Sequence, residues 1–188
     1  MAVLPIRIMG DAGLHSPAAP VDEITDEIRT LVADMFDTMD AAPGVGLAAP
    51  QVGVSLRIYT YGYQDDDGGP WRGVIINPEL WMRPIEPGAP DPEEESEGCL
   101  SFPGERFPLR RSDEVLVTGS DLDGNPVRIE VTGWRARIMQ HEYDHLDGIL
   151  YLDRLDDGEW KTVQKLARKR GWGVTGQSWT PGVDDIDA

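Results

Sequence analysis

Residues 134–147 read WRARIMQHEYDHLD, and they are predicted to form a helix at the centre of the fold. Thr132 precedes them, at a position where a hydroxyl can cap the free N–H groups of the first turn. Gly148 follows them, where a left-handed glycine commonly ends a helix. Both ends of the helix are therefore expected from the local sequence.

Two histidines and a glutamate lie on one side of this predicted helix. At about 100° per residue, His145 is roughly 40° from His141 around the axis and Glu142 is about 100° away. Two imidazoles one turn apart can bind one metal ion, and the carboxylate between them can activate water beside it. The chain has only three histidines, and two of them are in this motif. The alternative is a pair of core histidines held by hydrogen bonds.

A catalytic metal site needs a third protein ligand, and Cys99 is the better of two candidates. Its thiolate is a good ligand for soft and borderline metals, and Gly98 permits a tight backbone before it. His15, the other candidate, lies in a proline-rich stretch. A lone cysteine can instead be a small buried hydrophobe. Because it is the only cysteine, Cys99 cannot form an internal disulfide, which agrees with a reducing compartment.

Residues 44–51 read GVGLAAPQ and place small residues next to an amide side chain. Small residues let the backbone approach a ligand closely. Gln51 has amide donors that can hold a developing oxyanion. The segment matches neither glycine-rich phosphate-binding pattern, so the alternative is an ordinary turn with a surface glutamine.

The whole chain is predicted to be α+β, with short antiparallel or mixed sheets packed around the central metal-binding helix. Helical spacing of apolar residues occurs over residues 21–40, and a last helix is expected near 157–170. Strand patterns occur at four places, and a turn at 123–125 joins the last two: 56–61, 74–76, 115–118 and 127–131.

Residues 1–170 are expected to form a single catalytic domain, followed by an irregular tail at 171–188. A turn is expected at 65–70 and a long loop rich in proline and acidic residues at 83–97.

The chain is strongly acidic, with 34 Asp and Glu against 17 Lys and Arg and a net charge of −17. This charge disfavours DNA or anionic membranes over most of the surface. Residues 161–170 are a basic exception, which indicates either a contact with a polyanion or a solvated helix face. Because no apolar stretch is long enough for a membrane span and no signal peptide is present, we expect a cytoplasmic location.

Three segments resemble, in order and content, the signature motifs of peptide deformylases: GVGLAAPQ at 44–51, EGCLS at 97–101 and HEYDH at 141–145. The likeness extends over roughly residues 5–155. A cysteine ligand upstream of HExxH separates this family from ordinary zinc proteases. The chain departs from the family at Phe102, where Val or Ile is more frequent, at residues 83–96, which look like an insertion, and beyond about residue 170.

The resemblance implies a metal-dependent hydrolase that removes the formyl group from the N-terminal formylmethionine of newly made polypeptides. It implies one divalent metal ion, Fe²⁺ first, with Zn²⁺ or Ni²⁺ able to fill the same site. The implied metal ligands are Cys99, His141 and His145. The implied catalytic groups are the Glu142 carboxylate as base, with the Gln51 amide and the Leu100 backbone N–H stabilising the oxyanion.

The resemblance also implies a methionine pocket lined by Val45, Gly46, Glu97, Leu100 and His141. Backbone groups of Gly46 and Glu97 would bind the peptide like a neighbouring strand. Arg106 matches a family arginine and is expected to orient Glu97, or else to be an exposed charge. Asp144 is expected to support the site, or else to lie on the helix surface. The expected partners are nascent formylmethionyl polypeptides and, transiently, the ribosome through residues 161–170, with no DNA and no membrane.

Two other function classes compete with this one. A zinc peptidase with a different third ligand would keep its metal and activity after Cys99→Ser and would cut internal peptide bonds. A non-enzymatic homologue would keep the fold as a binding module. Such proteins usually lack the base or a ligand, whereas Glu142, Cys99 and both histidines are present here.

Overall fold

The computed structural model describes residues 2–64 and 70–184 of the chain. Its helices are α1 (Asp26–Ala41), α2 (Gly133–Leu146) and α3 (Asp157–Arg170), with 3-10 turns η1 (Ala12–His15), η2 (Ala49–Val52) and η3 (Tyr151–Arg154). Its strands are β1 (Ile6–Arg7), β2 (Gly46–Ala48), β3 (Ile58–Tyr63), β4 (Trp71–Met82), β5 (Ser96–Cys99), β6 (Phe102–Pro108), β7 (Glu114–Ser120), β8 (Pro126–Thr132) and β9 (Ser178–Trp179).

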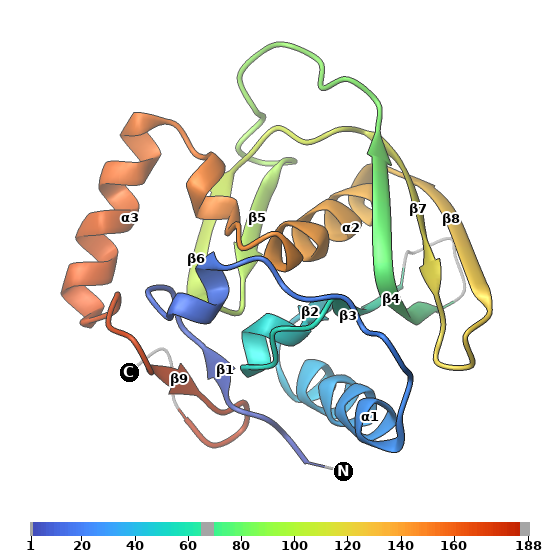
Figure 1. Cartoon of the computed structure of the whole chain (residues 1–188). Helices are drawn as coiled ribbons and strands as arrows, with labels where there is room; N and C mark the ends of the chain where they lie inside the picture. The colour runs from blue at the N-terminus through green and yellow to red at the C-terminus, as the bar shows by residue number, and fades with distance from the viewer. Residues whose placement is uncertain (1, 65–69, 185–188) are drawn as a thin grey trace.

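The strands of the described residues form three antiparallel sheets, of which the largest packs against α2 (Figure 1). The largest has the order β2-β3-β4-β7-β8, and the other two are the pairs β5-β6 and β1-β9. Helix α2 packs across the five-stranded sheet, and β5 approaches it from the other side. The predicted α+β class with a central helix is confirmed. None of the helices in the described part of the chain is long and apolar enough to cross a membrane.

Helix α2 has an apolar side and a polar side, and both are buried. Ala136, Met139 and Leu146 pack against sheet residues that include Tyr59, whose hydroxyl lies 3.2 Å from the Met139 sulfur. Polar residues of α2, among them His141 and His145, are buried as well. Buried polar side chains need hydrogen-bond partners from other elements. Helix α2 therefore does more than pack against the sheet, because its polar face meets polar groups of other elements.

The ends of α2 differ in detail from the prediction. Thr132 occupies the N-cap position, but its hydroxyl makes no capping hydrogen bond. Asp147 is the C-cap, and Gly148 follows with φ of +73°. A Cβ at Gly148 would lie 2.6 Å from the backbone nitrogen of Ser16, so this glycine also permits the N-terminal arm to pass closely.

Strand β4 is much longer than the expected strand at 74–76, because it continues through an irregularity at Asn77. The register shifts between Ile76 and Glu79, and Asn77 has φ of +50°. The Asn77 side chain both donates to and accepts from the backbone of Val21, at 2.8 Å in each case. These two hydrogen bonds stabilise a positive-φ backbone conformation, which residues other than glycine rarely adopt.

The acidic loop and the C-terminal tail also differ from what was expected. The acidic loop is shorter than 83–97, because Ser96–Cys99 form β5 against β6. The tail from residue 171 is not wholly irregular, because β9 pairs with β1. Most of the turn expected at 65–70 lies outside the described residues, as do residues 185–188 of the tail.

Candidate functional site

Cys99, His141 and His145 come together in space, and all three are buried. Their ligand atoms lie within 4.8 Å of one another, and Cys99 Sγ is 3.3 Å from His145 Nε2. Cys99 ends β5, whereas both histidines lie one turn apart on α2. One thiol and two imidazoles form a donor set that suits zinc, iron and related transition metals. His15 is outside this cluster, with its Nδ1 3.9 Å from Asp153.

The orientation of His141 is fixed by a carboxylate from β5. His141 Nδ1 lies 3.3 Å from Glu97 Oε1, which directs Nε2 to the opposite side of the ring. Metal-binding histidines commonly make such a hydrogen bond, because it fixes both the tautomer and the ring orientation. The His141 and His145 rings meet at 75° with their centroids 4.9 Å apart. The buried Nδ1 of His145 has no hydrogen-bond partner among the described residues, so this arrangement fits a metal ion better than a pair of core histidines held by hydrogen bonds.

Glu142 is buried next to the three candidate ligands, and its Oε2 has no hydrogen-bond partner among the described residues. Burial raises the pKa of its carboxyl to about 7. The side chain lies against Gly46 of β2, where a Cβ would come within 2.2 Å of Glu142 Oε1. Position 46 therefore has to be glycine for the carboxylate to occupy this place.

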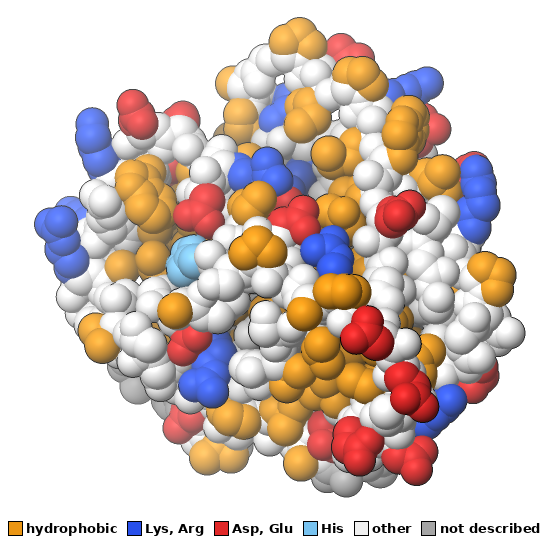
Figure 2. All heavy atoms as spheres, viewed as in Figure 1, with side chains coloured by type: hydrophobic (Ala, Val, Ile, Leu, Met, Phe, Trp, Pro, Cys, Tyr) orange, Lys and Arg blue, Asp and Glu red, His pale blue; other side chains and the backbone are white. Residues whose placement is uncertain are grey.

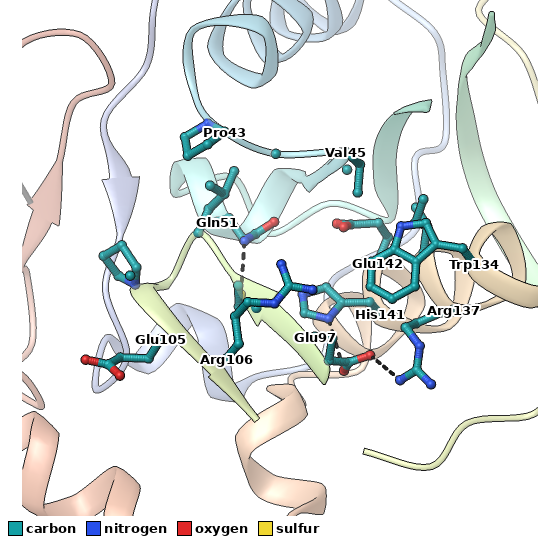
Figure 3. Close-up of a pocket in the computed structure, with 18 residues that line it drawn as sticks. Pro43, Val45, Gln51, Glu97, Glu105, Arg106, Trp134, Arg137, His141 and Glu142 are labelled. Atoms are coloured by element: carbon teal, nitrogen blue, oxygen red, sulfur yellow. Dashed lines mark hydrogen bonds and ion pairs between the residues drawn. The ribbon is translucent and has the colours of Figure 1, made fainter. Parts of the chain in front are cut away.

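Gln51 faces Glu142 across the pocket (Figure 3). Its Oε1 accepts from the backbone N–H of Ala48 at 2.8 Å, which fixes the amide. Its Nε2 donates to Ser101 Oγ at 3.2 Å and lies 3.6 Å from Cys99 Sγ. Gln51 is only 1% exposed, so the alternative of a surface glutamine is wrong.

Glu97 is the centre of a buried ion network. Arg111 donates to its two carboxylate oxygens at 2.6 and 3.3 Å, and Arg137 donates to one of them at 3.1 Å. Although burial opposes ionisation, the charge of Arg111 holds the pKa of Glu97 well below its usual range. Glu97 is therefore a carboxylate that can accept from His141, as Figure 3 shows together with Arg137.

The same network reaches Asp144 on α2. Arg111 donates to Asp144 at 2.6 Å, and Arg154 donates to both of its oxygens at 2.7 and 2.6 Å. Asp144 is 6% exposed, so it is not a helix-surface carboxylate. Arg111 thus connects β5 and α2, the two elements that supply the candidate ligands.

Arg106 does not orient Glu97, contrary to the expectation. Glu97 pairs with Phe107 across the β5-β6 ladder, and Gly98 pairs with Arg106. Because successive side chains in a strand point to opposite faces, Arg106 and Glu97 lie on different faces of this sheet. Arg106 instead donates to the Ser96 carbonyl at 2.5 Å, and Arg111 and Arg137 contact Glu97. Sequence reasoning missed these two arginines, since their spacing carries no motif.

A cavity of about 360 Å³ opens beside the three candidate ligands. All of the residues expected to bind substrate line it: Val45, Gly46, Glu97, Leu100, Arg106 and His141. Gln51, Cys99 and Glu142 line it too, whereas His145 is among the buried residues behind it. Trp134 and Arg137 also contribute to its wall, and nothing in the sequence had indicated them (Figure 3).

This chain is similar to known proteins both in sequence and in fold. The pattern of the polypeptide deformylase family matches residues 3–161. A peptide deformylase of Mycobacterium sp. (strain JLS) is 49% identical over 191 residues, which cover 98% of this chain and 97% of that protein. One from Rhodococcus opacus (strain B4) is 50% identical over 187 residues, covering 97% and 95% respectively. The crystal structure of peptide deformylase from Ehrlichia chaffeensis has a TM-score of 0.79 and 34% identity, and the match covers 90% of this chain and 97% of that one.

Proposed function

The chain belongs to the polypeptide deformylase family and removes the N-formyl group from new polypeptides, and we propose that Cys99, His141, His145 and Glu142 carry the reaction. The observation that supports this assignment is the convergence of one sulfur and two ring nitrogens within 4.8 Å, beside a buried carboxylate. The substrate is the formylated N-terminus of a nascent chain, and the product is formate with a free amino terminus.

A divalent metal ion fits the Cys99, His141 and His145 cluster. The donor set suits borderline metals, the ligands come from rigid elements, and Glu97 already holds one imidazole. When bound, the ion polarises the formyl carbonyl and makes water a better nucleophile. We propose Fe²⁺ in the cell, with Zn²⁺ or Ni²⁺ as alternatives, because the donors define a class of metals rather than one.

Glu142 is the general base of this proposal. Its carboxylate takes a proton from the attacking water and later gives it to the leaving amine. Gln51 and the backbone N–H of Leu100 donate to the oxygen on which negative charge develops. The Gln51 amide is fixed by Ala48 beside Cys99, so its Nε2 is already placed next to the ligand cluster.

The formylated peptide is proposed to bind as an extended strand between β2 and β5. Strand β2 is at the edge of the five-stranded sheet, and β5 pairs with β6 on one side within the described chain. The backbone groups of Gly46 and Glu97 then face the substrate, as in other β-strand additions. The methionine side chain of the substrate enters the cavity and packs against the wall formed by Val45, Leu100 and His141.

The decisive experiment is a formate-release assay on a formyl-Met peptide, using protein purified anaerobically and analysed for metal. Formate release with about one metal ion per chain is the expected outcome. The matched substrate is an acetyl-Met peptide of the same sequence, whose extra methyl group should make it a poor substrate. Cleavage of internal peptide bonds without formate would instead favour a zinc peptidase.

Gly46→Ala is expected to lower kcat by about 100-fold, because a shift of roughly 1 Å in a catalytic group has this effect. The added methyl would lie 2.2 Å from Glu142 Oε1, and the flexible carboxylate can move away without unfolding the chain. Gly44→Ala is the matched control, since its methyl meets Leu100 Cδ1 at 2.8 Å instead. We expect that control to change KM more than kcat. Equal kcat in both variants would contradict the placement of the base.

We also propose that residues 1–170 form the catalytic domain, that the protein is cytoplasmic, and that it binds neither DNA nor membranes.

A transient contact with the ribosome through α3 is a further part of the proposal. Basic side chains lie along α3, while acidic ones gather over α1 (Figure 2). Ribosomal RNA should therefore attract α3 and little else on the surface. Co-sedimentation with ribosomes should weaken steeply with salt and with Lys165→Glu and Lys169→Glu together. Salt-independent or absent co-sedimentation would remove this proposal.

A further inference from the structure

The C-terminal tail returns to the catalytic core and reaches the turn that follows Cys99. Strand β9 pairs with β1 so that Trp179 is opposite Ile6, which brings the C-terminal tail beside the N-terminal segment (Figure 1). Trp179 is 5% exposed and belongs to the core that contains Leu47 and Leu100. A residue of the tail is therefore a neighbour of the pocket wall.

The side chain of Trp179 makes a specific polar contact in this core. Its indole Nε1–H donates to the backbone carbonyl of Leu100 at 2.8 Å. The next carbonyl, that of Ser101, accepts from the backbone N–H of Met9 at 2.8 Å. The two terminal segments thus hold consecutive carbonyls of the turn between β5 and β6.

The hydrogen bond to Leu100 acts on a rigid unit. The carbonyl of Leu100 and the N–H of Ser101 belong to one planar peptide group. That N–H points at Cys99 Sγ, with a distance of 3.4 Å. Because the group is planar, holding its oxygen also sets the direction of its N–H. Donation to the carbonyl further polarises the N–H toward the sulfur.

We propose that Trp179 is a positioning residue of the active site, which holds the Leu100–Ser101 peptide so that its N–H donates to the Cys99 sulfur and the preceding Leu100 N–H faces the substrate. This inference rests on the proposed function for the roles of Cys99 and Leu100. It gives the tail a part in the reaction, although Trp179 itself touches neither substrate nor metal.

The competing explanation is that Trp179 only fills the core. Trp172 of the same tail provides the comparison, since its ring packs edge-on against Phe102 with centroids 5.1 Å apart. Trp172→Phe removes a similar volume next to Phe102, at the start of β6, which directly follows the turn that Trp179 contacts. Trp179→Phe removes volume together with the N–H donor to Leu100.

The experiment compares the two variants in formate release and in the cobalt-substituted protein. Trp179→Phe is expected to lower kcat by about 10-fold with little change in KM, as loss of an outer-shell partner commonly does. It should also move the near-ultraviolet sulfur-to-cobalt charge-transfer band to longer wavelength, because a thiolate with fewer hydrogen bonds is a stronger donor. Trp172→Phe should leave both kcat and the band close to those of the unchanged protein.

An unchanged kcat and band in Trp179→Phe would overturn the inference, and so would equal changes in both variants. If Trp179→Phe does not fold, the benzothiophene analogue of tryptophan at position 179 has nearly the same volume without the N–H and decides the question. If the unchanged protein releases no formate, the proposed function fails. The band comparison still reports on the hydrogen bond in that case, so the two failures are distinguishable.

Discussion

Glu142→Gln is expected to reduce kcat by about 1,000-fold, within the range for loss of a general acid–base group, while the metal content stays unchanged. Glutamine has nearly the same shape as glutamate, so it fits the space against Gly46. It cannot take a proton from water or return one to the amine. The effect should therefore appear in kcat rather than in KM.

The stability of this variant should not fall. Glu142 is 4% exposed, and burial penalises its charged form. A neutral amide in the same position avoids that penalty, so the melting temperature should be equal or higher. A lower kcat together with unchanged or improved stability is the pattern expected of a catalytic residue. Active-site residues often lower the stability of the folded protein, so replacing one can raise that stability.

Glu105→Gln is the matched control for Glu142→Gln. Glu105 also lines the pocket, but its carboxylate lies 3.5 Å from Arg170 on the side away from α2. We expect this variant to keep kcat within about threefold, as for a surface ion pair of little energetic weight. Formate release at saturating formyl-Met peptide measures kcat for both variants, and metal analysis of each preparation shows whether the metal content is unchanged. Normal turnover by Glu142→Gln would exclude it as the base.

The features that could be predicted from the sequence are those set by local geometry. The angle between His141 and His145 follows from the helix period, and the β7-β8 hairpin follows from its turn signal. Such features depend on residues a few positions apart. Cys99 was predicted from its chemistry and from the family motif, and the structure places it beside both histidines.

The features that could not be predicted depend on contacts between distant elements. Arg111 reaches Glu97 and Asp144 from a connecting segment, and no spacing rule marks it. Strand β9 has two residues and pairs with the other end of the chain, so it carries no alternation to detect. Arg106 was assigned to Glu97 from likeness alone, and the strand register places them on opposite faces.

The buried arginines also explain how this site tolerates its concentration of charge. Glu97 and Asp144 share Arg111, and each has a second arginine, Arg137 or Arg154. Buried charges are retained only when paired and hydrogen-bonded, and both carboxylates have such partners. They hold β5 and α2 at a fixed separation, and that separation sets the distance between the thiol and the two imidazoles.

Cys99→Ser is the second change with a large expected effect, because it removes the soft donor and leaves the two imidazoles. A serine hydroxyl stays protonated near neutral pH and is a poor ligand for the metals proposed here. Metal affinity should fall by more than about 100-fold, since loss of an outer-shell partner alone costs up to that much. Formate release should fall with it, and excess metal should restore only part of it.

His15→Ala is the control that separates this site from a peptidase with another third ligand. His15 is the remaining histidine, and its Nδ1 lies 3.9 Å from Asp153, outside the cluster. We expect His15→Ala to keep metal and turnover, whereas Cys99→Ser loses both. Equilibrium dialysis against Zn²⁺ and formate release measure the two properties independently. If Cys99→Ser kept its metal and turnover while His15→Ala lost them, the ligand set would have to include His15, and the turn after Cys99, which Gln51 and Trp179 hold, would have no part in metal binding.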